Sequence, residues 1–108
     1  MTTYVAELNT ENFHDIINNN KLVVVDIWAS WCKPCVQLSP TIDEVAAEFG
    51  EKVLVGKLNV DSNGDIVKEL GVRNIPTVLI YKNGEIVDKF VGVKSKSEIS
   101  EMITPLID

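Results

Sequence analysis

The 108-residue chain has only two cysteines, one histidine and no long hydrophobic run, and each shortage excludes a class of protein. Its purely apolar stretches, such as Leu22-Val23-Val24-Val25, are far too short to span a bilayer. Lys and Arg number 10 against 16 Asp and Glu, and the net charge of −6 argues against a general nucleic-acid surface. Two cysteines cannot form the disulfide framework of a small secreted protein.

No targeting signal is visible at the N-terminus. Residues 1–4 show no basic region followed by an apolar stretch, so we expect no signal peptide and a cytoplasmic location. The hydrophobic content of 45% is that of an ordinary globular protein, and the length suits one compact domain. Without an internal repeat or a linker, we expect a single domain over residues 1–108, and nothing requires more than a monomer.

Hydrophobic periodicity predicts alternating strands and helices along the chain. The predicted strands cover residues 4–8, 22–28, 53–60, 77–81 and 85–91, and the predicted helices start near Thr10, Pro34, Asp65 and Ser95. Asn83-Gly84 predicts a tight hairpin, Ser95 with Glu98 predicts a capping box, and Pro40 predicts a kink in the second helix. This order predicts an α/β fold with a largely parallel sheet, helices on both faces and an antiparallel hairpin at one edge.

Both cysteines lie in one segment, Trp31-Cys32-Lys33-Pro34-Cys35, where a strand pattern passes into a helix pattern. A helix that starts near Pro34 places Cys32 at its positive end, where unpaired backbone N–H groups favour a thiolate. Cys35 then lies about one turn into the helix, where it can attack a mixed disulfide formed at Cys32. A redox dithiol is therefore the leading interpretation.

Two other uses of the cysteine pair remain open. A passive disulfide that closes so short a loop would stabilise the fold by only about 2 kcal/mol on a chain-entropy argument. A zinc site usually takes four ligands, whereas the chain has one histidine, His14, and no second cysteine pair. We therefore expect no metal.

Two isolated charges stand inside predicted strands. Asp26 interrupts Val23-Val24-Val25-Asp26-Ile27-Trp28, where burial disfavours a carboxylate unless it is paired or protonated. Lys57 interrupts the next strand in the same way, so the two suggest a buried pair that serves proton transfer. The alternative is that both side chains point to solvent from strand ends.

Pro76 and the two tryptophans flank the predicted site. Pro76 is either an ordinary proline at the first residue of a strand or a cis proline that shapes a wall beside the thiols. We expect Trp28 to belong mainly to the core, and Trp31, in the loop before the helix, to belong to a functional surface.

With these residues assembled, the chain resembles the thioredoxin family over essentially its whole length. The matching features are Asp26, Trp28-Ala29-Ser30-Trp31-Cys32-Lys33-Pro34-Cys35, Pro40, Lys57, Ile75-Pro76-Thr77, Lys82-Asn83-Gly84 and Gly92. The resemblance implies the thioredoxin fold, a central mixed five-stranded sheet flanked by four helices. It also implies a protein-disulfide reductase that binds no cofactor and works through a redox-active Cys32–Cys35 disulfide.

The resemblance further implies a role for individual residues. Cys32 is the exposed nucleophile, Cys35 is the buried resolving thiol, and Asp26, helped by Lys57, transfers the proton for Cys35. Pro76 is expected to be cis. The implied substrate-binding groove consists of Trp31, Lys33, Pro34, Ile75, Pro76, Val91 and Gly92.

The implied electron donor is a flavin-containing thioredoxin reductase that draws on NADPH. Implied acceptors are oxidised proteins such as peroxiredoxins, methionine sulfoxide reductases or ribonucleotide reductase, with no nucleic acid and no membrane among the partners. Two rival functions remain, an oxidase or isomerase of the same fold and a binding module without redox turnover. Pro34 favours the reductant, because the histidine common there in oxidases and isomerases would stabilise the reduced form.

Two residues depart from the family pattern. Lys33 stands where glycine is usual, and Val36 stands where lysine is frequent. A cation at position 33 favours the Cys32 thiolate, and loss of a cation at position 36 works the other way. We expect the two effects nearly to cancel, because solvent screens both.

Overall fold

The computed structural model describes residues 5–108, which form five strands and four helices. In chain order they are β1 (Val5–Leu8), α1 (Phe13–Asn19), β2 (Leu22–Trp28), α2 (Lys33–Phe49), β3 (Leu54–Asn59), α3 (Gly64–Glu69), β4 (Thr77–Lys82), β5 (Glu85–Val91) and α4 (Lys96–Ile103). Short 3-10 turns follow α2 at Gly50–Lys52 and α4 at Thr104–Leu106. Residues 1–4 lie outside the described residues. They include Tyr4, which was predicted to open the first strand, and they are the residues on which the signal-peptide expectation rests.

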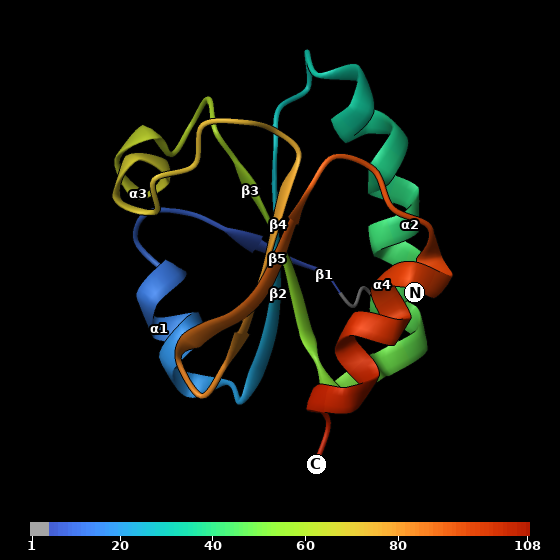
Figure 1. Ribbon diagram of the computed structural model, residues 1–108. Helices are drawn as coiled ribbons and strands as arrows, with labels where there is room; N and C mark the ends of the chain where they lie inside the picture. Colours follow the sequence, from blue (N-terminus) through green and yellow to red (C-terminus); the bar gives the residue numbers. More distant parts are fainter. Residues whose placement is uncertain (1–4) are drawn as a thin grey trace.

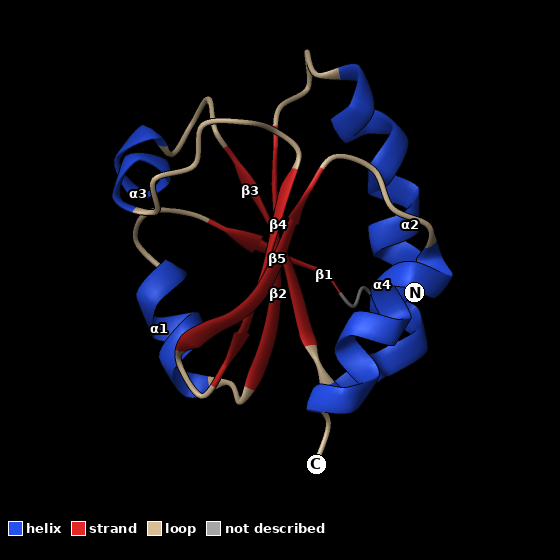
Figure 2. Cartoon of the chain, in the orientation of Figure 1, coloured by secondary structure: helices blue, strands red, loops and turns tan. Residues whose placement is uncertain are grey.

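The strands form one mixed sheet in the order β1-β3-β2-β4-β5. Seen edge-on, the sheet lies between two layers of helices, with α1 and α3 on one face and α2 and α4 on the other (Figures 1 and 2). This arrangement confirms the mixed five-stranded sheet with four helices that the family resemblance implies. Among residues 5–108, no helix combines the length and the apolar character needed to cross a membrane.

The expectation of a largely parallel sheet was wrong for β4. Strands β1, β3 and β2 are parallel, but β4 runs antiparallel to β2, and β5 runs antiparallel to β4. Ile27 near the end of β2 therefore pairs with Thr77 at the start of β4. The periodicity of single elements carries no information on strand direction, so the β-α-β order suggested a parallel crossover that the chain does not make.

β2 is the centre of the fold, and both of its faces are covered. Its residues face the two helical layers alternately, which explains why a nearly unbroken apolar run forms a strand here. Val24 packs in the core cluster that includes α2 and α4, whereas Val23 and Val25 pack in the cluster that includes α1. By the same alternation, Asp26 and Trp28 project toward the α2 face.

Most of the local signals are confirmed. Asn83 and Gly84 both have positive φ, 54° and 85°, as a tight hairpin turn with right-handed strand twist requires. Ser95 and Glu98 form the capping box of α4, and Gly50 follows α2 with φ 55°. Pro40 lies inside α2, as the sequence pattern indicates, and the kink expected there stays a prediction.

The predicted cap of α1 was wrong by two residues. The N-cap is Asn12 rather than Thr10, and Asn9 and Asn12 exchange backbone-to-side-chain hydrogen bonds of 2.7 and 2.8 Å. Thr10 instead donates its backbone N–H to the side chain of Asn63, 3.0 Å away. The reciprocal Asn bonds close the turn before the helix, so the helix begins later than the pattern suggests.

Gly56 lies where β3 packs closely against the edge strand β1. A Cβ atom at this position would lie 2.6 Å from Leu8 Cγ on β1, in a fully packed region. We expect Gly56→Ala to lower the free energy of unfolding by about 1–3 kcal/mol, because Leu8 must leave its place. The measurement is urea unfolding followed by circular dichroism. Gly64→Ala is the matched control, since nothing lies within 4 Å of its Cβ position, and an equal loss there would contradict the packing argument.

Candidate functional site

The site lies at one end of the sheet, where segments that are distant in sequence meet. Cys32 follows the end of β2, and Pro76 precedes the start of β4, the antiparallel neighbour of β2. The Pro76 carbonyl accepts a 2.9 Å hydrogen bond from the Gly92 N–H, which attaches the residue after β5 to the same end. The pairing of β2 with β4 therefore places the thiols, the proline and the end of β5 together.

The two cysteines are joined by a disulfide at the N-terminus of α2, so the structure represents the oxidised form. Cys32 is the N-cap, and its sulfur lies 3.3 Å from the Cys35 backbone N–H, which donates to it. Cys32 is 7% exposed and Cys35 is 1% exposed, so the expectation of an exposed Cys32 was wrong: both cysteines are largely buried, and Cys32 is the less buried of the two. The helix end therefore offers a positive environment to the more accessible sulfur, as the sequence predicts.

The Ile75-Pro76 segment forms a wall beside the accessible sulfur. The Cys32 sulfur lies 3.8 Å from the Ile75 carbonyl oxygen, and the Ile75–Pro76 peptide bond is cis, as the resemblance implies. Ile75 and Trp28 also pack against the buried cluster of Ala29, Cys32 and Cys35. Trp28 is thus partly buried beside the disulfide, in agreement with its predicted core position.

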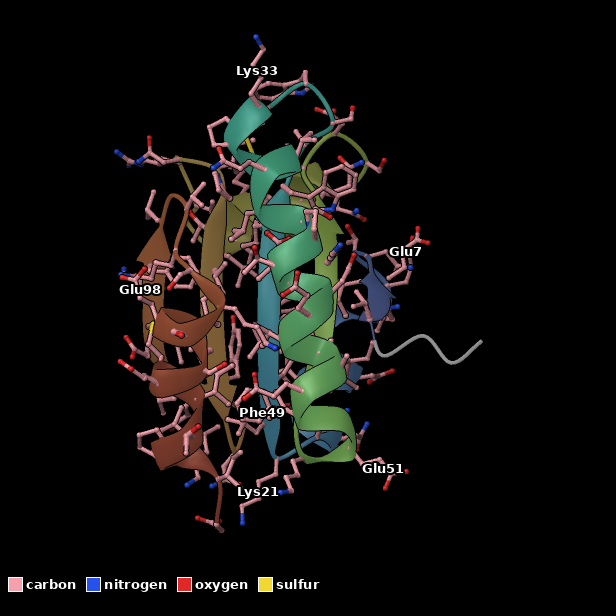
Figure 3. All side chains as sticks on the ribbon, turned by 90° about the vertical axis from the view of Figure 1, so that its right-hand side faces the viewer. Glu7, Lys21, Lys33, Phe49, Glu51 and Glu98 are labelled. Carbon is pink, nitrogen blue, oxygen red and sulfur yellow. A yellow bond between two sulfur atoms is a disulfide. The ribbon has the colours of Figure 1, made fainter. Side chains whose placement is uncertain are left out.

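The rim of the disulfide is mostly apolar and exposed. Trp31 is 68% exposed and Val91 is 60% exposed, so both predicted groove residues present apolar area to solvent. Lys33 projects from the tip of α2 away from the body of the protein (Figure 3). The Trp31 indole Nε1–H lies 3.1 and 3.2 Å from the two carboxylate oxygens of Asp61, which orients the ring.

Asp26 is buried as predicted, at 1% exposed, and lies on the α2 face of the sheet. Neither of its carboxylate oxygens has a hydrogen-bond partner among the described residues. Burial raises the pKa of Asp26 to about 7, since the charged form loses its hydration. The nearby charge of Lys57 works in the opposite direction on this pKa, and that of Asp43 works in the same direction as burial. A carboxyl group with this pKa can exchange a proton near neutral pH.

The predicted direct pair of Asp26 and Lys57 is not formed. The two residues are register partners on β2 and β3, as neighbouring strands require. The Lys57 ammonium instead donates to the Ser39 hydroxyl at 2.6 Å and to the Asp43 carboxylate at 2.8 Å, both on α2. Lys57 therefore acts on Asp26 through its electric field and not through a hydrogen bond.

Sequence reasoning missed three residues around the site. Asp61 follows the end of β3, at the edge where β2 also ends, and this position was the available signal. Ser39 and Asp43 follow Cys35 at intervals of four, a spacing that places all three on one side of α2. Among the described residues, no three His, Cys, Asp or Glu side chains gather as a metal site would require.

Comparison with known proteins identifies close relatives. A family profile described as Thioredoxin matches residues 4–105 of the chain. The chain is 44% identical over 98 residues to "Thioredoxin" of Chlorobaculum thiosulfatiphilum, which covers 90% of this chain and 91% of that protein. It is 42% identical to "Thioredoxin 2" of Chlorobaculum tepidum, over 90% of both chains. It is 41% identical to "Thioredoxin" of Pyropia yezoensis, over 95% of this chain and 97% of that one.

The raised pKa of Asp26 predicts how the stability of the fold changes with pH. The carboxyl group ionises near 3.8 in the unfolded chain and near 7 in the folded protein. Between these values the unfolded state binds fewer protons, so the free energy of unfolding falls as the pH rises. Asp26→Ala removes this loss and should stabilise the protein at pH 8, by up to about 4 kcal/mol if the whole shift contributes.

The measurement is urea unfolding of the parent and of Asp26→Ala at pH 4 and pH 8. The gain should shrink at pH 4, where the carboxyl is largely protonated in the folded state and half ionised in the unfolded chain. A difference in unfolding free energy that is the same at both pH values would contradict the raised pKa. A sharp loss of stability at pH 8 would instead make Asp26 a structural group.

Proposed function

The chain belongs to the thioredoxin family and carries the Cys-x-x-Cys active site of a thioredoxin disulfide reductase, and on that premise we propose how it works. We propose that Cys32 and Cys35 reduce disulfides in target proteins and that a thioredoxin reductase restores the dithiol. One observation carries most of the weight: the more accessible sulfur of the disulfide lies at a helix N-terminus beside the Ile75-Pro76 wall.

In the first step, the Cys32 thiolate attacks one sulfur of the target disulfide. A bond forms between Cys32 Sγ and that sulfur, the target S–S bond breaks, and its electron pair leaves on the second target sulfur. The N-terminal amides of α2, including the Cys35 N–H at 3.3 Å from Cys32 Sγ, support the attacking thiolate.

In the second step, Cys35 resolves the mixed disulfide. Asp26 takes the Cys35 proton, Cys35 bonds to Cys32, and the electron pair of the broken bond leaves on the target sulfur, which takes up a proton from solvent. The position of Asp26 supports this role. Asp26 lies on the α2 face of β2, two residues before Trp28, and Trp28 packs against the cluster that contains Cys35. Lys57 contributes by its charge, since its ammonium lies with Ser39 and Asp43.

The substrate docks as an extended segment whose backbone follows the Ile75-Pro76 loop. The exposed apolar area at the rim and the proximity of the Ile75 carbonyl to Cys32 support this binding mode. The groove residues in this proposal are Trp31, Lys33, Pro34, Ile75, Pro76, Val91 and Gly92.

The family membership implies a thioredoxin reductase and target proteins in general as partners. We propose further that the electrons come from NADPH through a flavin-containing reductase. Peroxiredoxins, methionine sulfoxide reductases and ribonucleotide reductase are the proposed acceptors. The protein works in this proposal as a monomer, as one domain over residues 1–108, and in the cytoplasm, where the reducing pool favours dithiols.

Insulin reduction by dithiothreitol tests the function. The unmutated protein should accelerate the reduction, and Cys32→Ser should return it to the uncatalysed rate, because the attacking sulfur is lost. Cys35→Ser should accumulate a mixed disulfide with insulin, seen by mass spectrometry, because nothing resolves it. No acceleration by the unmutated protein would refute the proposal.

The matched control is the double variant Cys32→Ser with Cys35→Ser, which should trap no insulin. Trapping at Cys35 in the Cys32→Ser variant would reverse the proposed order of the two sulfurs. The burial of Cys35, at 1% exposed, argues that Cys32 attacks first and Cys35 second.

A further inference from the structure

Three polar side chains line one side of α2 at intervals of four residues. Cys35 lies in the first turn, Ser39 follows one turn later, and Asp43 one turn after that. Their spacing places the resolving cysteine at one end of a polar strip and an exposed carboxylate at the other. The side chain of Asp43 is 58% exposed, so the strip runs from the protein interior to solvent.

Lys57 meets this strip from the sheet. Its ammonium group donates to Ser39 Oγ at 2.6 Å and to Asp43 Oδ1 at 2.8 Å. The Lys57 side chain is 19% exposed, so most of it lies inside the protein, and it also lines a pocket of about 350 Å³ beside Trp28. The ammonium is therefore held at the boundary between the interior and solvent by two side chains of the same helix.

Besides the exposed Glu7 of β1, Asp26 is the carboxyl group that lies beside Lys57 across the sheet. It is the register partner of Lys57 on the neighbouring strand, it is buried, and both carboxylate oxygens lack a partner among the described residues. Its partner on the other side, in β4, is the apolar Val78. An ammonium released from α2 would find in Asp26 a carboxylate with free hydrogen-bonding capacity.

We propose that Ser39 and Asp43 are positioning residues for disulfide reduction, because they hold the Lys57 ammonium on α2 and so limit the charge that reaches Asp26. The proposal rests on the function above, in which Asp26 takes the proton of Cys35. With Lys57 held aside, Asp26 remains a strong enough base to take that proton. With Lys57 bonded to it, the carboxylate would be stabilised and would take the proton less readily.

The effects of the charges around Asp26 agree with the proposal that Ser39 and Asp43 hold Lys57 away from it. Lys57 from β3 lowers the pKa of Asp26, and Asp43 from α2 raises it, while burial raises it most. Asp43 therefore acts twice on the same carboxyl group, directly through its own negative charge and indirectly through its hold on Lys57. Ser39 is uncharged, so it acts only through Lys57, which makes it the cleaner probe.

The test is a ¹³C NMR titration of the Asp26 carboxyl group in the oxidised protein. Asp43→Asn should lower the Asp26 pKa by about half a unit or more, and Ser39→Ala should lower it by less. Glu44→Gln is the matched control, since it removes the same charge at the next, exposed position of α2 and should leave the Asp26 pKa unchanged. Both effects should shrink in a Lys57→Met background, because there is no ammonium left to hold.

Two results would overturn the positioning role. One is a shift of the Asp26 pKa by Asp43→Asn and Ser39→Ala that is equally large with Lys57 and in the Lys57→Met background. That result would mean that Asp43 acts on Asp26 only by charge repulsion and that Ser39 does not act through Lys57. The other is an Asp26 pKa that neither variant moves beyond the Glu44→Gln control. The titration uses the oxidised protein alone, so it decides this question even if insulin reduction fails and the proposed function is lost.

A kinetic measurement then connects the cluster to the reaction. The decay of a preformed mixed disulfide at Cys32 reports the attack by Cys35, and its pH profile should shift to lower pH in Asp43→Asn and Ser39→Ala but not in Glu44→Gln. An unshifted profile, alongside a shifted Asp26 titration, would show that the cluster tunes Asp26 without positioning anything for reduction.

Discussion

The pairing of β2 with β3 on one side and with β4 on the other is the constraint on which the site depends. Parallel neighbours end at the same edge of a sheet, and an antiparallel neighbour begins there. The loop after β2, which carries Trp31 and Cys32, therefore lies beside Ile75-Pro76 before β4 and Asp61 after β3. Because α2 starts at this edge, its free N–H groups also point at the sulfur. The site thus exists only when this pairing has formed.

Because β2 is central and buried, the requirements of folding stability and of proton transfer conflict at Asp26. Folding favours an apolar side chain there, since Val24 two residues earlier packs fully into the core on the same face. A carboxyl group at this position gains no hydrogen bond among the described residues and loses its hydration. What it acquires is a pKa of about 7, well above the ordinary value of about 3.9 for an exposed aspartate. The residue is therefore unfavourable for stability and suited to proton transfer.

Features determined within a few residues were predictable from the sequence, and features determined by the assembly were not. β2, the Asn83-Gly84 hairpin and the Ser95 capping box depend on local backbone preferences and burial, and all three are confirmed. The direction of β4 depends on how the chain returns after α3, for which no local pattern exists. Of the site, the burial of Asp26 and the place of the cysteines at a helix start could be read from the chain.

The direction of the Lys57 side chain shows why the rest of the site could not be predicted. Strand register correctly made Lys57 a neighbour of Asp26, but a lysine has a four-carbon stem and can place its charge in several directions. Hydrogen bonds to Ser39 and Asp43 determine the direction of the Lys57 side chain, and these two residues lie 18 and 14 residues away in sequence, on α2. Adjacent backbone positions therefore give proximity, while the hydrogen bonds of the side chains depend on the third element that packs over them.

The two departures around the cysteines act on the contact surface more than on the sulfur. Lys33 projects into solvent from the helix tip, where screening weakens its effect on a thiolate (Figure 3). Val36 is 54% exposed and adds apolar area where a lysine is frequent in the family. Trp31 and Val91 are exposed as well, so three apolar side chains on the segments that form the site face solvent, with Lys33 and Asp61 as nearby charges. Charges in such places alter the rate of encounter with a partner, whereas buried apolar contact sets most of the affinity. Valine in place of lysine at position 36 therefore affects the fit of this surface to a partner more than it affects the reactivity of Cys32.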